Sequence, residues 1–324
     1  MDSIERAAQK LAERQKAEAS RDTAPPKPEA KIATAAPHRE PARQELAPAA
    51  APASEETPSA APGPARAPRP AAPRSTGPVI EIDTQRLGRL GFVSPDQPVT
   101  RVAEEFRVLK HRVLHNAFNA DWETEISPRL IMVTSAQPRE GKSFTAVNLA
   151  LSIASERDTR VLLVDGDFLN PSVFKSLHLP RPPQGFIDVL EDEKRGLESV
   201  ILPTNINHLT LADAGRLNDL ASEYLSSQRM QRVCAELIER YEDRIVIFDS
   251  SPLLASSEPS VLSHHVGQIL FVVEARRSTH GTVRAGLEMI HDTSKVMMVL
   301  NKSRLLAGGG AFGGYYDYYR NSKR

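Results

Sequence analysis

The chain has 324 residues, and its 41 basic and 41 acidic side chains give a formal net charge of zero. This balance argues against nonspecific electrostatic binding of nucleic acid, so no nucleic-acid partner is expected. The single cysteine, Cys234, excludes an internal disulfide framework and a cysteine-based zinc site. Because no apolar run approaches the roughly 18 residues of a membrane span, we expect a cytoplasmic protein without direct membrane insertion.

Residues 1–20 predict a short amphipathic helix. Asp2 is a suitable N-cap with Glu5 three residues later, and Ile4 and Leu11 lie on one narrow apolar stripe. A helix of this length is marginal alone in water. Two interpretations therefore stay open, a frayed solvated helix and a docking helix for a partner.

Residues 21–78 predict a disordered linker rich in proline and alanine. Fourteen of the 25 prolines lie between Pro25 and Pro78, while the only large aliphatic side chains are Ile32 and Leu46. Such a segment cannot bury enough apolar surface to offset the entropy of ordering it. Its composition favours an extended chain.

Residues 79–305 predict a globular α/β domain in which buried aliphatic strands alternate with helices. This alternation is typical of a mostly parallel central sheet flanked by helices on both faces. The predicted strands are Leu130–Thr134, Val161–Asp165, His208–Ala212, Ile245–Asp249, Ile269–Val273 and Val296–Asn301. The predicted helices are Ser143–Glu156, Asn218–Tyr241 and Thr279–Asp292.

The strongest motif is a strand, a tight loop and a helix with the loop sequence AQPREGKS, residues 136–143. It follows the P-loop pattern except that alanine replaces the first glycine. Gly141 lets the backbone approach phosphate, Lys142 supplies a positive charge, and Ser143 can ligate Mg²⁺. With Arg139, Glu140 and Phe144, these residues form the predicted ATP-binding segment of a P-loop NTPase fold.

Two further strands end in aspartates. Val161–Asp167 carries Asp165 and Asp167, and the strand Ile245–Asp249 ends in Asp249. In a parallel sheet, ligands bind outside the carboxyl ends of the strands, so these carboxylates should meet the P-loop at one rim. We therefore expect ATP and Mg²⁺ as cofactors, with Ser143, Asp249 and Asp165 at the metal.

Together these elements resemble the bacterial tyrosine autokinases, or BY-kinases, of capsule and exopolysaccharide synthesis. The resemblance runs from about Thr100 to the C-terminus and is greatest to the exosortase-associated branch, which often begins with an IERAA-type helix. The family's Walker A, Walker A′ and Walker B motifs and its tyrosine cluster correspond to Ala136–Ser143, Val161–Asp167, Ile245–Asp249 and Tyr315–Tyr319.

The resemblance implies an ATP-dependent tyrosine autokinase that works in a homo-oligomer. Glu104, Arg107 and Lys110 match the family's E-x-x-R-x-x-R oligomerisation motif, with lysine in place of the last arginine. It also implies a partner, a membrane polysaccharide co-polymerase whose cytosolic tail activates the kinase. Such a partner would recruit the chain to the inner face of the cell membrane.

Residues 306–324 predict a flexible tail that carries the phosphoacceptors. Four of the six tyrosines lie here among glycines, and side chains 304–324 sum to a charge of +3. Each phosphotyrosine adds about −1.5 to −2, so phosphorylation would reverse this charge. The hypothesis is that the unmodified tail docks in a neighbouring subunit and leaves once phosphorylated. The phosphoacceptors are Tyr315, Tyr316, Tyr318 and Tyr319.

Three roles follow for the predicted site. Lys142 stabilises the phosphoryl oxygens, and either Asp165 or Asp167 accepts the phenol proton. Asn301, at the end of the last predicted strand, is a candidate for adenine contact or simply a turn residue.

A nucleotide-switch ATPase of the partition and division-site type is the alternative. Those proteins resemble this chain in their sheet and P-loop, but they need a signature lysine five positions before the Walker A lysine. Gln137 occupies that position here, which favours the kinase.

Overall fold

A seven-stranded sheet organises the part of the chain that the computed structural model describes, residues 78–303 without 96–99, 120–125, 217–218 and 241–242. The predicted N-terminal helix over 1–20, nearly all of the predicted linker, and the predicted tail with its four tyrosines lie outside the described residues.

The strand order is β3-β4-β2-β5-β1-β6-β7, and every pairing is parallel except that of β3 with β4. β1 therefore lies between β5 and β6. The strands are β1 (Leu130–Ser135), β2 (Arg160–Gly166), β3 (Leu202–Pro203), β4 (Leu209–Ala212), β5 (Arg244–Ser250), β6 (Gln268–Glu274) and β7 (Val296–Asn301).

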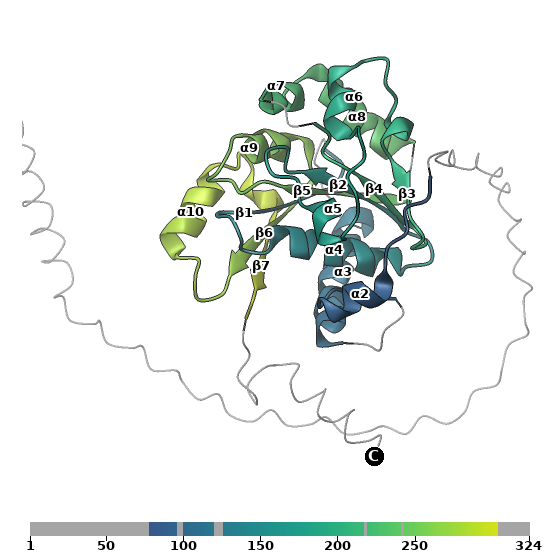
Figure 1. Ribbon diagram of the computed structural model, residues 1–324. Coiled ribbons are helices and arrows are strands. Elements are labelled where there is room, and N and C mark those ends of the chain that lie inside the picture. The colour runs from purple at the N-terminus through teal and green to yellow at the C-terminus, as the bar shows by residue number, and fades with distance from the viewer. Residues whose placement is uncertain (1–77, 96–99, 120–125, 217–218, 241–242, 304–324) are drawn as a thin grey trace, which may run out of the picture. The chain divides into compact units, whose positions relative to one another are not determined.

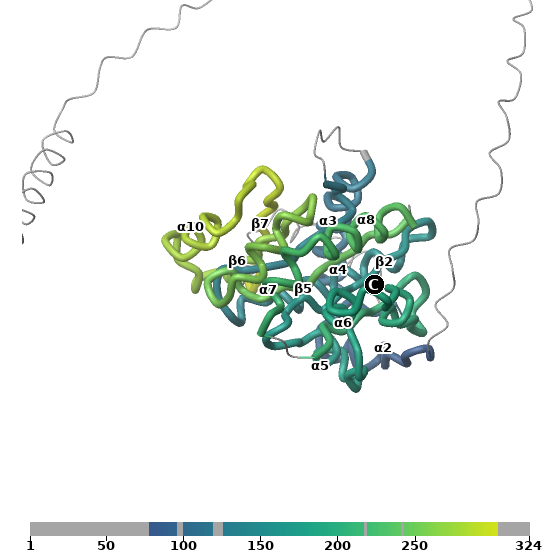
Figure 2. Tube along the Cα trace, turned by 90° about the horizontal axis from the view of Figure 1, so that it is seen from above, coloured from purple at the N-terminus to yellow at the C-terminus, as the bar shows by residue number. Residues whose placement is uncertain are grey.

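Helices cover both faces of this sheet (Figure 1). The apolar sides of α2, α3, α4 and α5 pack on one face, and those of α6 to α10 pack on the other. Seen from above, α10 lies at the end of the sheet that β6 and β7 form (Figure 2). The helices are α2 (Thr84–Arg89), α3 (Arg101–Asn119), α4 (Lys142–Ala154), α5 (Val173–Ser176), α6 (Phe186–Glu191), α7 (Ala221–Leu225), α8 (Gln228–Glu239), α9 (Glu258–Leu262) and α10 (His280–Glu288), with short 3-10 turns at Leu197–Ser199, Ser263–His265 and Thr293–Lys295.

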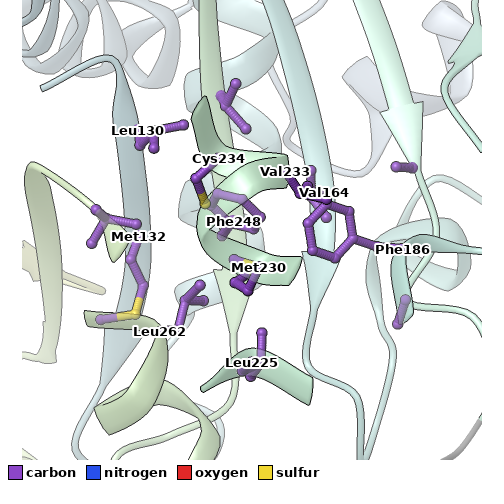
Figure 3. Close-up of a cluster of buried hydrophobic side chains, with 14 of the residues drawn as sticks. Leu130, Met132, Val164, Phe186, Leu225, Met230, Val233, Cys234, Phe248 and Leu262 are labelled. Carbon is purple, nitrogen blue, oxygen red and sulfur yellow. The ribbon is translucent and has the colours of Figure 1, made fainter. Parts of the chain in front are cut away.

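The central strands are buried on both faces, which explains why their sequences are continuously aliphatic. In β1, Leu130 and Met132 enter one hydrophobic cluster while Ile131 and Val133 enter the other. Figure 3 shows the first cluster, where Phe186 packs edge-on against Phe248 with ring centroids 5.6 Å apart. Two full layers of side chains thus fix the sheet from which the functional loops project.

One sequence prediction was wrong, and one strand was not predicted. The helix predicted over Asn218–Tyr241 is two helices, α7 and α8, because the Ser227 hydroxyl accepts the Met230 N–H and caps a new helix. The antiparallel strand β3 was not predicted, since two residues show no periodicity. The six predicted strands are all present, with ends that differ by at most a few residues. In the described part of the chain, no helix has the length and apolar character to cross a bilayer.

Candidate nucleotide-binding site

The P-loop connects β1 to α4, as the sequence predicts. Gly141 caps α4 with a φ of 100°, a left-handed conformation that suits glycine, and exposed Arg139 has a φ of 70°. A Cβ added at Gly141 would lie 2.0 Å from Asn301 Nδ2. This position therefore needs glycine both for its backbone angle and for space.

The Glu140 side chain stabilises the conformation of the P-loop through two hydrogen bonds. Its side chain is buried, and one carboxylate oxygen accepts the Gln137 N–H at 2.7 Å. The other oxygen accepts a hydrogen bond from the Ser278 hydroxyl. The sequence predicted Glu140 in the ATP-binding segment, and its side chain acts here as an internal brace of the loop.

Three aspartates converge on the loop from the neighbouring strands β2 and β5. Asp165 and Asp249 are Cα partners in adjacent strands, and both are fully buried. Lys142 Nζ lies 3.0 Å from Asp167 Oδ2 in a largely buried ion pair. The predicted catalytic residues therefore come together at one rim of the sheet.

The Asp165 carboxylate is engaged by the backbone. Its Oδ2 accepts the N–H groups of Ser172 and Val173, both at 2.8 Å, which satisfies the start of α5. Its Oδ1 accepts the Asp167 N–H at 3.3 Å. Burial, with the nearby charge of Asp249, raises the pKa of Asp165 to about 8 against the effect of these hydrogen bonds.

Asp249 fits the metal role predicted for it. Ser143 Oγ lies 2.8 Å from Ser172 Oγ, which lies 3.4 Å from Asp249 Oδ2. Asp249 Oδ1 is buried and has no hydrogen-bond partner among the described residues. A buried carboxylate oxygen without a partner, close to the P-loop serine, suits Mg²⁺.

The charged side chains at this rim shift one another's pKa values. Burial raises the pKa of Asp249 to about 6, and the charge of Lys142 opposes that rise. Burial alone would lower the pKa of Lys142, but Asp249 and Asp167 outweigh it and raise the pKa. Among the described residues, no cluster of three or more His, Cys, Asp or Glu side chains forms a metal cage. This is compatible with Mg²⁺, which usually keeps water and binds through one or two carboxylates and substrate phosphates.

Two predicted nucleotide contacts have other partners in the structure. The Phe144 ring packs against Phe92 and Phe106, with centroids 5.1 and 6.2 Å away. Asn301 Nδ2 donates to the Glu140 carbonyl at 2.9 Å. An adenine contact by Asn301 stays a prediction.

Sequence reasoning missed a second ion pair at the same rim. Asp213 follows β4 and is fully buried, and Arg181 binds it through Nε at 3.0 Å and Nη2 at 2.6 Å. The signal was available, because Asp213 directly follows a predicted strand, as Asp249 ends one. Ser172, which links Ser143 to Asp249, carried no such signal.

The predicted oligomerisation residues lie on α3 but differ in exposure. Glu104 and Arg107 form a partly exposed pair at 3.1 Å. Lys110 is buried and binds Glu156 at 2.6 Å, at the end of α4. A subunit contact through Lys110 would have to break this internal pair, whereas Glu104 and Arg107 remain accessible.

Several known proteins resemble this chain in sequence. No protein-family model matches the chain. It is 26% identical to the tyrosine-protein kinase YwqD of Bacillus subtilis over 224 residues, which are 69% of this chain and 90% of YwqD. It is 27% identical to the putative tyrosine-protein kinase EpsB of Ralstonia solanacearum over 255 residues, covering 75% of this chain and 32% of EpsB. With the tyrosine-protein kinase wzc of Salmonella typhimurium it shares 29% identity over 58% of this chain and 26% of that one. The chain thus spans most of YwqD but less than a third of the other two.

Solved structures establish the fold independently. The tyrosine kinase domain of BceF superposes with a TM-score of 0.55 at 23% identity, covering 68% of this chain and 90% of that domain. The kinase domain of the Escherichia coli tyrosine kinase ETK gives 0.52 at 24% identity, covering 64% and 80%. The chain is therefore similar in sequence to bacterial tyrosine-protein kinases, and its fold is that of their kinase domains.

Proposed function

We propose that the protein is an ATP-dependent tyrosine autokinase that phosphorylates its own C-terminal tyrosines. The observation that carries the proposal is the convergence of Lys142 with Asp165, Asp167 and Asp249 at the P-loop, in a homologue of tyrosine-protein kinases. The four tail tyrosines supply acceptors that a nucleotide switch would not need.

In this mechanism Lys142 and the N–H groups at the start of α4 stabilise the phosphoryl oxygens. Ser143 and Asp249 would hold Mg²⁺, which neutralises charge on the phosphates when bound. The unpartnered Asp249 Oδ1 supports this assignment. Lys142 stays charged, since its pKa is raised.

Hydrogen bonding does not separate the two candidate bases, Asp165 and Asp167. Both Asp165 oxygens accept backbone N–H groups. Asp167 Oδ2 pairs with Lys142, and its Oδ1 accepts the Asn170 N–H at 3.0 Å. From the ordinary pKa values of an aspartate and a phenol, full deprotonation before attack would cost on the order of 8 kcal/mol. The raised pKa of Asp165 would narrow this gap. The proton should therefore leave the tyrosine late, as the new bond to phosphorus forms.

Tail phosphorylation occurs in trans within a homo-oligomer in this proposal. The tail carries a charge of +3 before modification and would dock at the aspartate-lined rim of a neighbouring subunit. Several phosphates reverse that charge and release the tail. A membrane polysaccharide co-polymerase would bring the oligomer to the inner face of the membrane and activate it, in support of exopolysaccharide synthesis.

Complementation between two inactive variants tests the reaction and its geometry together. Lys142→Met keeps an intact tail but loses the site, and a variant with all four tail tyrosines changed to Phe keeps the site but loses the acceptors. Mixed with Mg-ATP, the pair should regain phosphotyrosine on the Lys142→Met chain, located by mass spectrometry. If wild type modifies its tail but the mixture does not, the reaction is not in trans; if wild type carries no phosphotyrosine, the autokinase proposal is wrong.

A further inference from the structure

The last residue of β7 and the residue after it bind two consecutive carbonyls of the P-loop. Asn301 Nδ2 donates to the Glu140 carbonyl at 2.9 Å, and Lys302 Nζ donates to the Arg139 carbonyl at 2.6 Å. Together Asn301 and Lys302 form what we call the β7 clamp. It approaches the loop from β7, whereas the aspartates come from β2 and β5.

The clamp is itself held in place. Lys302 Nζ pairs with Glu274 at 3.1 Å, and the Asn301 carbonyl accepts the Ala275 N–H at 2.9 Å. Asn301 Oδ1 accepts the Lys302 N–H at 2.8 Å, and Lys302 adopts a left-handed φ of 55°. Because these contacts fix both side chains to the carboxyl ends of β6 and β7, the clamp is positioned before any nucleotide arrives.

Holding these carbonyls also orients the loop's donors. In a planar trans peptide the C=O and the following N–H point in opposite directions. Fixing the Arg139 carbonyl on β7 therefore turns the Glu140 N–H away from β7, and fixing the Glu140 carbonyl does the same for the Gly141 N–H. Backbone N–H groups of this loop are the donors that a P-loop offers to phosphate.

The clamp also lies where the C-terminal tail begins. The predicted tail with the four tyrosines starts at residue 306, four positions after Lys302. Only residues 303–305 separate Lys302 from this predicted tail, so the backbone connects the two directly.

We propose that Asn301 and Lys302 are positioning residues that couple the P-loop to the C-terminal tail. They orient the phosphate-binding amides, and the state of the tail changes nucleotide affinity through Lys302. The coupling rests on the proposed function, since it takes the tail as the phosphorylated segment. Linkage makes it reciprocal, so bound nucleotide should also order the start of the tail.

The clamp is tested by ADP binding in the full-length chain. Lys302→Met should weaken Mg-ADP binding by about tenfold, and Lys302→Arg should restore it to within about threefold. Arg277→Met is the matched control, because Arg277 pairs with the same Glu274 at 3.3 Å and, among the described residues, forms no hydrogen bond or ion pair with the loop. Isothermal titration calorimetry with thermal melts of each variant gives the comparison. Unchanged affinity in Lys302→Met, or an equal loss in Arg277→Met, overturns the clamp.

The coupling is tested on the unmutated chain, so a folding defect cannot obscure it. Mg-ADP should slow hydrogen exchange in peptides spanning 299–306, and phosphatase treatment of phosphorylated protein should change Mg-ADP affinity by about threefold or more. Equal affinities and unchanged exchange would refute the coupling. Absence of phosphate from the tail tyrosines would instead count against the autokinase, while the Lys302→Met result would still decide the clamp.

Discussion

Asp165 on β2 and Asp249 on β5 share one register position on adjacent strands, and neither carboxyl reaches solvent. Burial raises their pKa values to about 8 and about 6 from an ordinary value of 3.8. Both groups therefore hold a proton more firmly in the folded chain than in the unfolded chain. Without nucleotide, the free energy of unfolding should fall as the pH rises from about 4 to about 8.

Asp249→Asn removes the contribution of Asp249 to this pH dependence of stability. Between pH 5 and pH 8 the nucleotide-free variant should lose less stability than wild type, by on the order of 1 to 3 kcal/mol. Urea unfolding at several pH values measures the difference. Parallel pH profiles for the two proteins would show that Asp249 does not titrate in this way.

Lys142→Met should both abolish phosphotyrosine and destabilise the nucleotide-free protein. Lys142 and Asp167 have side chains only 11% and 5% exposed, so removing one partner leaves a buried charge at a cost of about 3 kcal/mol. Arg160→Met breaks a pair that is 47% and 44% exposed, and should cost less than about 1 kcal/mol. Denaturant unfolding of both variants tests this, and equal costs would contradict the buried pair.

Gly141→Ala should lower nucleotide affinity. A left-handed φ costs a residue with a side chain about 1 to 2 kcal/mol, and the added methyl would collide with Asn301. Gly281→Ala is the contrasting change, since Gly281 lies in α10 where a Cβ meets only Thr279 Oγ1 at 3.9 Å. It should stabilise the fold by about 0.5 to 1 kcal/mol. Mg-ADP titration and thermal melts separate the two effects; an unchanged affinity in Gly141→Ala would show that the loop tolerates a side chain.

Cys234 should be inert until the protein unfolds. The thiol is buried in α8 and burial raises its pKa to about 12, so almost no thiolate exists at pH 8. A maleimide should react at the rate of unfolding, and rapidly in denaturant. Fast labelling of the native protein at pH 8 would mean that α8 opens far more often than its packing suggests.

The rim of the sheet was predictable because buried aliphatic strands followed by aspartates define it. Parallel pairing then brings the strand ends together without further information, which is why Lys142, Asp165 and Asp249 were placed correctly near one another. The same rule, applied to the strand ending at Ala212, would have identified Asp213.

Other contacts leave no local pattern. Lys302 reaches the Arg139 carbonyl across 163 positions, and no spacing in the sequence encodes such a pair. The sequence predicted Asp165 at the metal. Only the structure shows that its Oδ2 already accepts hydrogen bonds from the Ser172 and Val173 N–H groups. The boundary between α7 and α8 did have a signal, because Ser227 is a residue type that caps helices. The apolar pattern that continues through both helices concealed it.

Because β1 sits between β5 and β6, the two halves of the sheet contribute different kinds of group to the loop. The reactive carboxylates lie at the ends of β2 and β5. The side chains that bind the P-loop carbonyls come from the β6–β7 half of the sheet. Chimaeras that exchange only the β6–β7 half with a homologue could therefore retune how tightly nucleotide is held while preserving the acid–base chemistry, which makes the two properties separately evolvable.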